Sequence, residues 1–387
     1  MTGATGTMGM AALRELASRS GHPTYILLAR DSKKNRRLLA PYLNSEGFEV
    51  IWGDLLDATS VSRGIAEADM CLHVGGMVSP LADHYPEKTL EVNLGSMRNI
   101  IDSVLSLPDP SRCPVVYIGS VSQYGPHNIP DHWVDASSPQ IPAKYDTYAY
   151  SKIEAERMLR ESGIPKWASL RLGSILSADL LKKGTDPITF HVPMRGVLEW
   201  TTDSDCGRLL ANLSSVKLPD EFWNRAYNIG SGKSFRLTYH EFETMLLRTL
   251  GCPPPEKIFE PEWFATGNFH GAFFRDSDLL ESFLHFRGHD DADTHFKKMK
   301  EGLPWYFRLT PIAPAFVIKM FMKSIAGKWP FGPLSWISES EPHKPDTPRK
   351  RKAEDMVNAF FGSRQQWENI PGWSDFTLPK VEKDAKR

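Results

Sequence analysis

The spacing of apolar and polar positions along the first 175 residues predicts an α/β fold. Short apolar runs of strand length are separated by stretches in which apolar residues recur at helical spacing. The predicted strands are 25–29, 48–52, 70–74, 115–119 and 168–172, and the predicted helices are 9–20, 33–44, 59–67, 87–106 and 148–162. Strands that alternate with helices of this length predict βαβ units, and therefore a Rossmann-type, doubly wound parallel sheet.

The pattern changes after residue 175. One more strand is predicted at 227–230 and a helix at 238–250, before three consecutive prolines at 253–255 break the chain. The remainder is rich in aromatic residues and proline, which predicts a smaller, mainly helical lobe. We expect a dinucleotide-binding domain at 1–175 with a return segment at about 200–235, a substrate-binding lobe at 176–330, and a linker and tail at 331–387. The proline and basic residues of 342–352 are expected to form an exposed linker.

Composition excludes several functional classes. The 387 residues contain 46 Lys and Arg against 47 Asp and Glu, so the basic excess typical of nucleic-acid binding is lacking. The four cysteines are scattered, which argues against a disulfide framework or a zinc site, and the His and Asp residues of 289–295 are expected to form a solvated loop. We expect no membrane span and no secretory signal, and hence a cytoplasmic protein. The apolar stretch 312–326 is expected to pack inside the helical lobe.

A glycine-rich segment opens the chain and leads directly into a helical pattern. Glycines at this spacing allow a tight turn, close approach of a pyrophosphate to backbone N–H groups, and close packing of the helix, whose positive end then faces the phosphate. The candidate cofactor-binding residues here are Gly3, Thr5, Gly6, Thr7, Met8 and Gly9. Such a turn normally follows the central strand of the sheet, and the sequence leaves no room for that strand before Thr2. We therefore expect the first strand to be missing or truncated.

The segment that directly follows the predicted strand 25–29 bears on the choice between NAD and NADP as cofactor. Arg30 follows the strand 25–29 at the position where a dinucleotide fold meets the adenosine ribose, and Asp31, Ser32 and two lysines come next. A guanidinium beside a hydroxyl suits a 2′-phosphate, which favours NADP over NAD, whereas Asp31 alone would suit NAD. Asp54 and Leu55 follow the next strand near the adenine, and Gly75 and Gly76 follow the strand after that.

Tyr148 and Lys152 are spaced four residues apart, so on a helix they share one face. A nearby ammonium favours the phenolate, which predicts a tyrosine pKa below its usual value of about 10. Tyr148 is then a candidate general acid/base for a carbonyl and its alcohol, a role that contributes about 10²–10⁴-fold to the rate. Ser120 ends a predicted strand at the same edge of the sheet and can hold the substrate oxygen.

Taken together, these segments resemble the extended short-chain dehydrogenase/reductases, the NAD-dependent epimerase/dehydratase family. The matching pieces run in family order through residues 1–250: the glycine turn, 53–55, 73–76, 92–95, 120–125, 148–152 and 227–232. The resemblance implies that Tyr148 is the acid/base and that Lys152 binds the nicotinamide ribose. It further implies that Ser120 orients the substrate, that Asn93 supports a proton relay, that Leu172 faces the nicotinamide, and that the assembly is a homodimer.

The resemblance leaves three functions open. Dehydratases of this type carry an Asp-Glu pair directly after the catalytic hydroxyl, whereas Val121 and Ser122 follow Ser120 here, so dehydration is not expected. An epimerase acting on sugar nucleotides usually brings a basic residue to the diphosphate, a role for which Arg195 is the candidate. The aromatic lobe can instead line a pocket for an apolar, steroid-like or flavonoid-like ketone. We favour a small-molecule ketone/alcohol oxidoreductase over an NAD-dependent epimerase, with a non-catalytic nucleotide-binding protein as the third reading.

Overall fold

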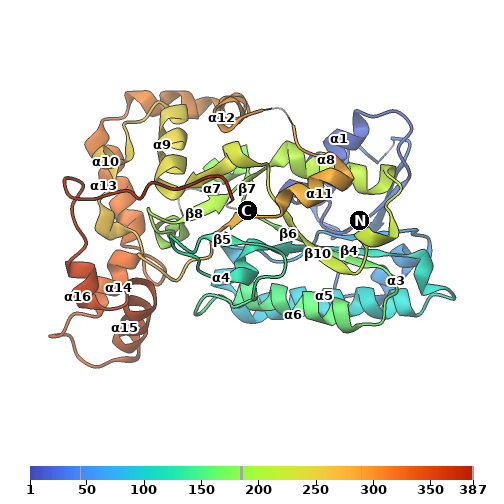
Figure 1. Cartoon of the computed structure of the whole chain (residues 1–387), viewed down its shortest axis with the longest axis horizontal. Helices are drawn as coiled ribbons and strands as arrows, with labels where there is room; N and C mark the ends of the chain where they lie inside the picture. The colour runs from blue at the N-terminus through green and yellow to red at the C-terminus, as the bar shows by residue number, and fades with distance from the viewer. Residues whose placement is uncertain (44, 184–185, 289, 386–387) are drawn as a thin grey trace.

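A computed structural model describes residues 1–43, 45–183, 186–288 and 290–385. A parallel sheet lies between two layers of helices, and a second, mainly helical lobe extends from one side (Figure 1). The strands follow the spatial order β2, β1, β3, β4, β6, β10 when the bridge through Thr2 is included. Their bounds are β1 Tyr25–Ala29, β2 Phe48–Trp52, β3 Cys71–His73, β4 Val115–Ser120, β6 Trp167–Leu172 and β10 Arg225–Ile229. The predicted Rossmann-type parallel sheet is confirmed.

The central position of the sheet is held by a single bridging residue. Thr2 forms parallel bridges with Leu28 of β1 and His73 of β3. Its backbone N–H donates to the Leu72 carbonyl at 3.0 Å, while the N–H of Leu28 donates to the Met1 carbonyl at 3.1 Å. The place of the strand that we expected to be missing or truncated is therefore occupied by Met1 and Thr2. Thr2 joins the two halves of the sheet and positions the glycine turn that follows.

Helices cover both faces of the sheet. One layer contains α3 (Ala58–Ala66), α5 (Pro86–Leu105) and α6 (Thr147–Glu161), and the other contains α1 (Thr7–Ala17), α8 (Asp203–Ser215) and α11 (Ser277–Leu284) (Figure 1). All six residues of β4 are buried, as expected for a parallel strand covered on both sides. Two apolar clusters, one on each face, fix the sheet, so its carboxyl-terminal edge is a rigid base for side chains.

The second lobe contains mainly short helices. They are α7 (Ala178–Lys183), α9 (Tyr239–Leu250), α10 (Pro255–Ile258), α12 (Ala292–Glu301), α13 (Ala315–Ala326), α14 (Pro333–Glu339), α15 (Pro348–Phe361) and α16 (Arg364–Glu368), with the 3-10 helix η7 (Trp305–Ile312). Short strands β7 (Ile175–Leu176), β8 (Val197–Glu199), β9 (Thr201–Thr202) and β11 (Arg236–Thr238) connect this lobe to the sheet. The chain then returns across the lobe (Figure 1), and near the last described residues the Lys383 carbonyl accepts from Arg236 of β11 at 2.8 Å.

Two expectations for this lobe need correction. The proposed linker at 342–352 is an irregular and largely exposed segment only as far as Thr347, because α15 begins at Pro348 and packs Ala353 and Val357 in one apolar cluster with Trp336 of α14. The apolar stretch 312–326 does not pack fully inside the lobe, because Phe316 and Met320 on α13 are 64% and 63% exposed. Among the described residues, no single helix is long and apolar enough to cross a bilayer, although η7 and α13, bent by 115°, meet that criterion as a pair.

Candidate active site

One large cavity runs along the carboxyl-terminal edge of the sheet and continues into the helical lobe. Its volume is about 1880 Å³, and it is lined at one end by the glycine turn and at the other by α9, α10 and α13. The cavity brings together predicted catalytic residues and predicted cofactor-binding residues. They are Gly3, Thr5, Gly6, Thr7, Met8, Gly9, Arg30, Ser32, Asp54, Leu55, Gly75, Gly76, Ser120, Tyr148, Lys152 and Leu172. Parallel strands end at the same edge, which explains why segments distant in sequence meet here.

The glycine turn fits a phosphate group. Gly6 caps α1 without any side-chain hydrogen bond, so the first N–H groups of the helix face the cavity with no intrahelical acceptor. A Cβ added to Gly3, whose φ is +70°, would lie 2.6 Å from the backbone nitrogen of Gly75, and one added to Gly9 would lie 2.3 Å from the Gly3 carbonyl oxygen. Only glycine allows this close packing of turn, helix and strand, which leaves a cradle for an anion at the positive end of α1.

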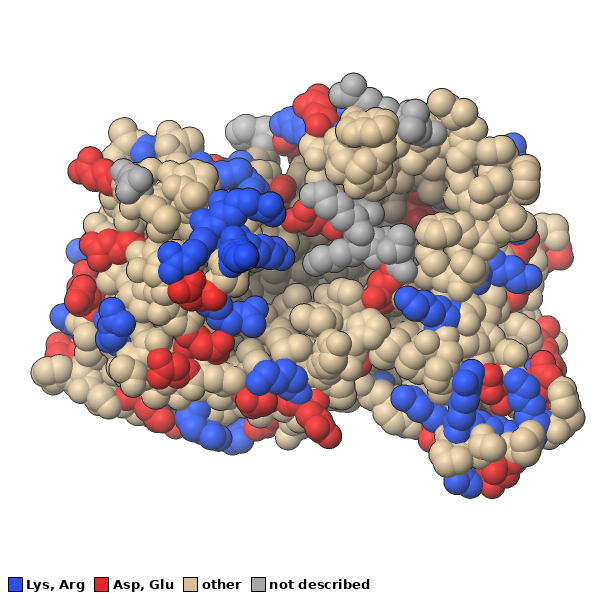
Figure 2. Space-filling view, turned by 180° about the vertical axis from the view of Figure 1, so that it is seen from behind, with Lys and Arg blue, Asp and Glu red and all other residues tan. Residues whose placement is uncertain are grey.

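The far end of this cleft is basic. Arg30 and Lys34 line the cavity and are exposed, and Ser32 caps α2 (Lys33–Leu39) by accepting from the N–H of Asn35. Asp31 forms a two-point ion pair with Arg36, at 2.5 and 2.8 Å, so its charge is already countered by the protein. Lys and Arg side chains gather on one side of the hollowed surface in Figure 2. At this end of the cleft, Arg30 and Lys34 therefore present positive charge, while the carboxylate of Asp31 is occupied by Arg36.

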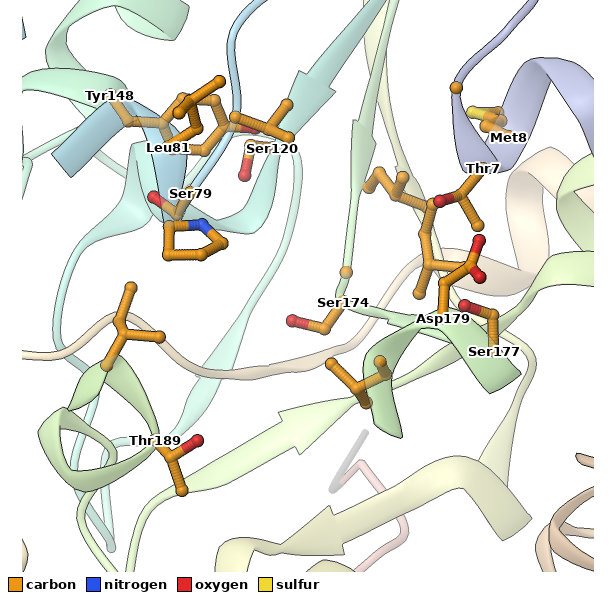
Figure 3. Close-up of a pocket in the computed structure, with 18 of the residues that line it drawn as sticks. Thr7, Met8, Ser79, Leu81, Ser120, Tyr148, Ser174, Ser177, Asp179 and Thr189 are labelled. Carbon is orange, nitrogen blue, oxygen red and sulfur yellow. The ribbon is translucent and has the colours of Figure 1, made fainter. Parts of the chain in front are cut away.

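Ser120 and Tyr148 lie side by side across the cavity from the glycine turn (Figure 3). Their hydroxyl groups share a hydrogen bond. Ser120 ends β4, while Tyr148 lies in the first turn of α6, where Asp146 caps the helix by accepting from the N–H of Ala149 at 2.8 Å. Lys152, one turn further on, donates to the Ile118 carbonyl at 2.8 Å. The predicted trio is therefore assembled around a single point of the cavity.

The expected direction of the tyrosine pKa shift was wrong for this structure. Burial raises the pKa of Tyr148 to about 12, and the nearby carboxylates of Asp146 and Asp83 add to the effect, which the hydrogen bond from Ser120 only partly offsets. Burial also lowers the pKa of Lys152 to about 8. The Lys152 ammonium lies 5.8 Å from the centre of the Tyr148 ring and is held by a carbonyl. Desolvation therefore outweighs the ammonium, and the Tyr148 hydroxyl keeps its proton at neutral pH.

Asn93 is the one predicted site residue that lies outside the cavity lining. Its side-chain oxygen accepts from the N–H of Met77 at 2.7 Å, and its amide donates to the Met77 carbonyl at 3.1 Å and to Ser151 at 2.9 Å. These bonds tie the loop after β3 to α6. A Cβ added to Gly76 would lie 2.8 Å from this oxygen, so the amide also holds the glycine loop close.

Sequence reasoning missed a buried polar network beneath Ser120. Gln123 accepts from the N–H of Ser120 at 2.7 Å and donates to Glu156 at 2.9 Å. Glu156 also pairs with Arg171 at 2.5 Å, and both side chains are at most 5% exposed. Burial by itself would raise the pKa of Glu156, but Arg171 reverses the effect and lowers it. Gln123 lies in the segment 120–125 that carried the family resemblance, so the sequence offered a signal for this residue. Its partners on α6 and β6 could be identified only from the fold, because they are distant in sequence.

The half of the cavity in the second lobe is mainly apolar, although Ser174, Ser177, Asp179 and Thr189 also line it (Figure 3). Phe242, Leu246, Leu250, Phe259, Ile318 and Met322 are among the residues that line it. Beyond β6, none of the described lining residues is Lys or Arg. One buried acid interrupts the surface: burial raises the pKa of Glu243 to about 7, and its carboxyl group is hydrogen-bonded to Tyr239. Among the described lining residues beyond β6, a diphosphate would therefore find no Lys or Arg to pair with.

Two arginines near this half are engaged elsewhere. Arg195, the expected diphosphate ligand, stacks on the ring of Phe376 at 4.5 Å and does not line the cavity. Arg208 donates to the Phe286 carbonyl at 2.8 Å and pairs with Asp205. His289 of the predicted solvated loop lies outside the described residues. Elsewhere in the described chain, no group of three His, Cys, Asp or Glu side chains is arranged to hold a metal ion.

A comparison with known protein families finds a match for the N-terminal part of the chain. Residues 1–183 match the NAD dependent epimerase/dehydratase family. This match covers the glycine turn, the basic end of the cleft, Ser120, Tyr148 and Lys152, and it ends where the helical lobe begins.

Solved structures share the fold across most of the chain. A double mutant of the dTDP-glucose 4,6-dehydratase DesIV from Streptomyces venezuelae, with NAD and DAU bound, aligns with a TM-score of 0.63 at 19% identity, over 79% of this chain and 95% of that one. A UDP-glucose 4-epimerase from Thermus thermophilus, in complex with NAD, aligns with a TM-score of 0.58 at 17% identity, over 78% and 98%. A UDP-glucuronic acid 4-epimerase from Bacillus cereus, in complex with UDP-glucuronic acid and NAD, aligns with a TM-score of 0.60 at 16% identity, over 78% and 98%.

Proposed function

Because residues 1–183 match the NAD dependent epimerase/dehydratase family, we propose that the protein is a nicotinamide-dependent oxidoreductase that interconverts an apolar ketone and its secondary alcohol. The observation that carries this proposal is the composition of the cavity. Ser120 and Tyr148 line it opposite the glycine turn, and the lining beyond β6 is mainly apolar and contains no Lys or Arg among the residues described.

The chain's own residues supply the proton chemistry. Bound nicotinamide dinucleotide, for which the glycine turn and the basic end of the cleft provide a fit, would supply the hydride donor or acceptor. Ser120 holds the substrate oxygen by a hydrogen bond, and Tyr148 gives its phenolic proton to that oxygen during reduction. The Lys152 ammonium, cationic below a pKa of about 8, stabilises the negative charge that Tyr148 acquires.

Exposed basic groups at the adenosine end support NADP as the preferred cofactor. Arg30 is free to meet a 2′-phosphate, since the neighbouring carboxylate of Asp31 is paired with Arg36. NAD remains the alternative, because the solved structures of similar fold hold NAD.

The experiment is to denature the purified protein and quantify the nucleotide that it releases. A reductase exchanges its cofactor at each turnover, so we expect little bound nucleotide and ready binding of added NADPH. A sugar-nucleotide epimerase regenerates its cofactor within one cycle. Near-stoichiometric trapped NAD would therefore contradict the proposal and favour the epimerase.

A further inference from the structure

The surface formed by η7 and α13 carries a concentration of exposed apolar side chains. Seven of the seventeen large hydrophobic residues that are exposed in the described chain lie between positions 305 and 321. They are Trp305, Tyr306, Ile312, Phe316, Val317, Met320 and Phe321. Soluble proteins rarely expose so many neighbouring apolar side chains without a partner.

Helix α13 is apolar on both of its faces. Its inner face packs Ile318, Met322 and Ile325 against the core of the lobe. Its outer face presents two rows of residues at i, i+4 spacing, Phe316 with Met320 and Val317 with Phe321, and these side chains are 41–64% exposed. A helix that is hydrophobic around most of its circumference is typical of an apolar environment on both sides.

Basic residues precede and follow this apolar surface along the chain. Residues 297–328 contain seven Lys and Arg residues and a single acidic residue, whereas the whole chain has a net charge of −1. Lys297 and Lys300 on α12 are exposed before η7, as is Lys298, which pairs with Asp290 at 2.6 Å. Lys323 and Lys328 are exposed at the end of α13. Figure 2 shows broad uncharged areas on the side of the molecule that carries the helical lobe. Trp and Tyr next to exposed lysines are the side chains that the headgroup region of a bilayer accommodates.

We propose that η7 and α13 dock the protein onto an anionic lipid surface without spanning it. The apolar outer face of α13 would enter the boundary between headgroups and acyl chains, and the lysines on either side would contact anionic headgroups. Net attraction to a negative surface distinguishes this partner from a second copy of the same chain, which would bring the same positive segment into contact with itself.

The docking surface is also a wall of the cavity. Val317 and Phe321 are exposed on α13 and line the cavity as well, together with Tyr306 of η7. If the proposed function holds, an apolar substrate dissolved in the bilayer reaches Ser120 and Tyr148 through this wall. The docking itself does not depend on that function, because its test measures binding to vesicles and not turnover.

The test is co-flotation of the full chain with vesicles of phosphatidylcholine alone and of phosphatidylcholine mixed with phosphatidylglycerol. We expect binding to the mixed vesicles, and a loss on the order of tenfold for Phe316→Ser combined with Met320→Ser. The matched control is Leu105→Ser combined with Val216→Ser, which removes two exposed apolar side chains of other surfaces and should bind as the unaltered protein does. Lys323→Glu keeps the apolar face of α13. This variant should weaken binding to the vesicles that contain phosphatidylglycerol and leave any binding to phosphatidylcholine alone unchanged.

Three results would overturn the proposal. The first is absence of binding to the mixed vesicles, and the second is an equal loss in the control variant. The third is an oligomer in solution that Phe316→Ser combined with Met320→Ser converts to monomer, because the face would then be an interface between copies. Thermal unfolding of each variant shows whether a lost interaction reflects lost folding. Failure of vesicle binding with intact turnover of an apolar ketone would leave the proposed function standing.

Discussion

The side chain of Gln123 accepts a hydrogen bond of 2.7 Å from the backbone N–H of Ser120. Its amide end donates to Glu156, which is held in turn by Arg171, so the hydroxyl at the end of β4 is connected to a buried ion pair between α6 and β6. The position of Ser120 is therefore fixed by residues that do not line the cavity.

Gln123→Ala should lower kcat by about ten- to a hundredfold with a smaller effect on KM, because misplacement of Ser120 affects the transition state most. Gln140→Ala is the matched control, since Gln140 also donates to Glu156, at 2.7 Å, and forms no hydrogen bond with Ser120. Steady-state kinetics of both variants check the prediction. Equal losses of kcat would show that Gln123 acts through general stability and not through Ser120.

Tyr148→Phe should reduce turnover by about 10²–10⁴-fold while cofactor binding is retained, because only the proton donor is removed. Tyr150→Phe provides the control on the same helix, as the Tyr150 side chain is half-exposed and does not line the cavity. Turnover and nucleotide affinity are measured for both. A Tyr148→Phe protein with unchanged turnover would remove this residue from the mechanism.

The rate of ketone reduction should fall as pH rises through about 8. Lys152, whose pKa burial lowers to about 8, is cationic below that pH and neutral above it, while Tyr148, with a pKa of about 12, keeps its proton throughout this range. Loss of the ammonium removes the charge that stabilises the developing tyrosinate. The pH profile of kcat/KM reports these groups in the free protein. A Lys152→Met variant should be slower and lack this step; a wild-type profile that stays level well above pH 8 is the contrary outcome.

Arg30→Ala should weaken NADPH binding by about ten- to a hundredfold, the value of one or two charge-assisted hydrogen bonds, and leave NADH binding nearly unchanged. Arg37→Ala removes an exposed arginine of α2 that does not line the cavity, and serves as the control. Fluorescence titration with each cofactor gives the two affinities. Similar losses for NADPH and NADH would argue that Arg30 does not read the 2′-phosphate.

Affinity for a neutral apolar ligand should decrease as pH rises through about 7. Burial raises the pKa of Glu243 to about 7, so its carboxyl group is neutral below that pH and becomes a charge in the apolar half of the cavity above it. Glu243→Gln retains a polar side chain beside Tyr239 and should make the affinity independent of pH. Binding of an environment-sensitive apolar dye at several pH values provides the measurement; the same pH dependence in Glu243→Gln would assign it to another group.

The sequence allowed the sheet to be predicted well, because each strand is an apolar run bounded by helical periodicity. The strands at 25–29 and 48–52 match β1 and β2 in both bounds, and the glycine turn, Ser120 and Tyr148 meet at one edge because parallel topology requires it. The pKa of Tyr148 could not be predicted, since it depends on burial and on Asp83 and Asp146, which only the fold brings near.

The second lobe was harder to predict from sequence. Apolar periodicity identifies helices such as α13 but does not say whether both faces are covered, so the exposure of Phe316 and Met320 was missed. The sequence also did not show that Arg195, the candidate diphosphate ligand, would stack on Phe376, because the two residues are far apart in the chain. Long-range pairing of this kind leaves no local pattern.

The most direct test of the proposed function is net oxidation of NADPH in the presence of either apolar cyclic ketones or sugar nucleotides. We predict that NADPH is consumed with one or more of the ketones, that Tyr148→Phe abolishes this consumption, and that Tyr150→Phe does not. Conversion of a sugar nucleotide to its epimer without net change in the cofactor would contradict the account.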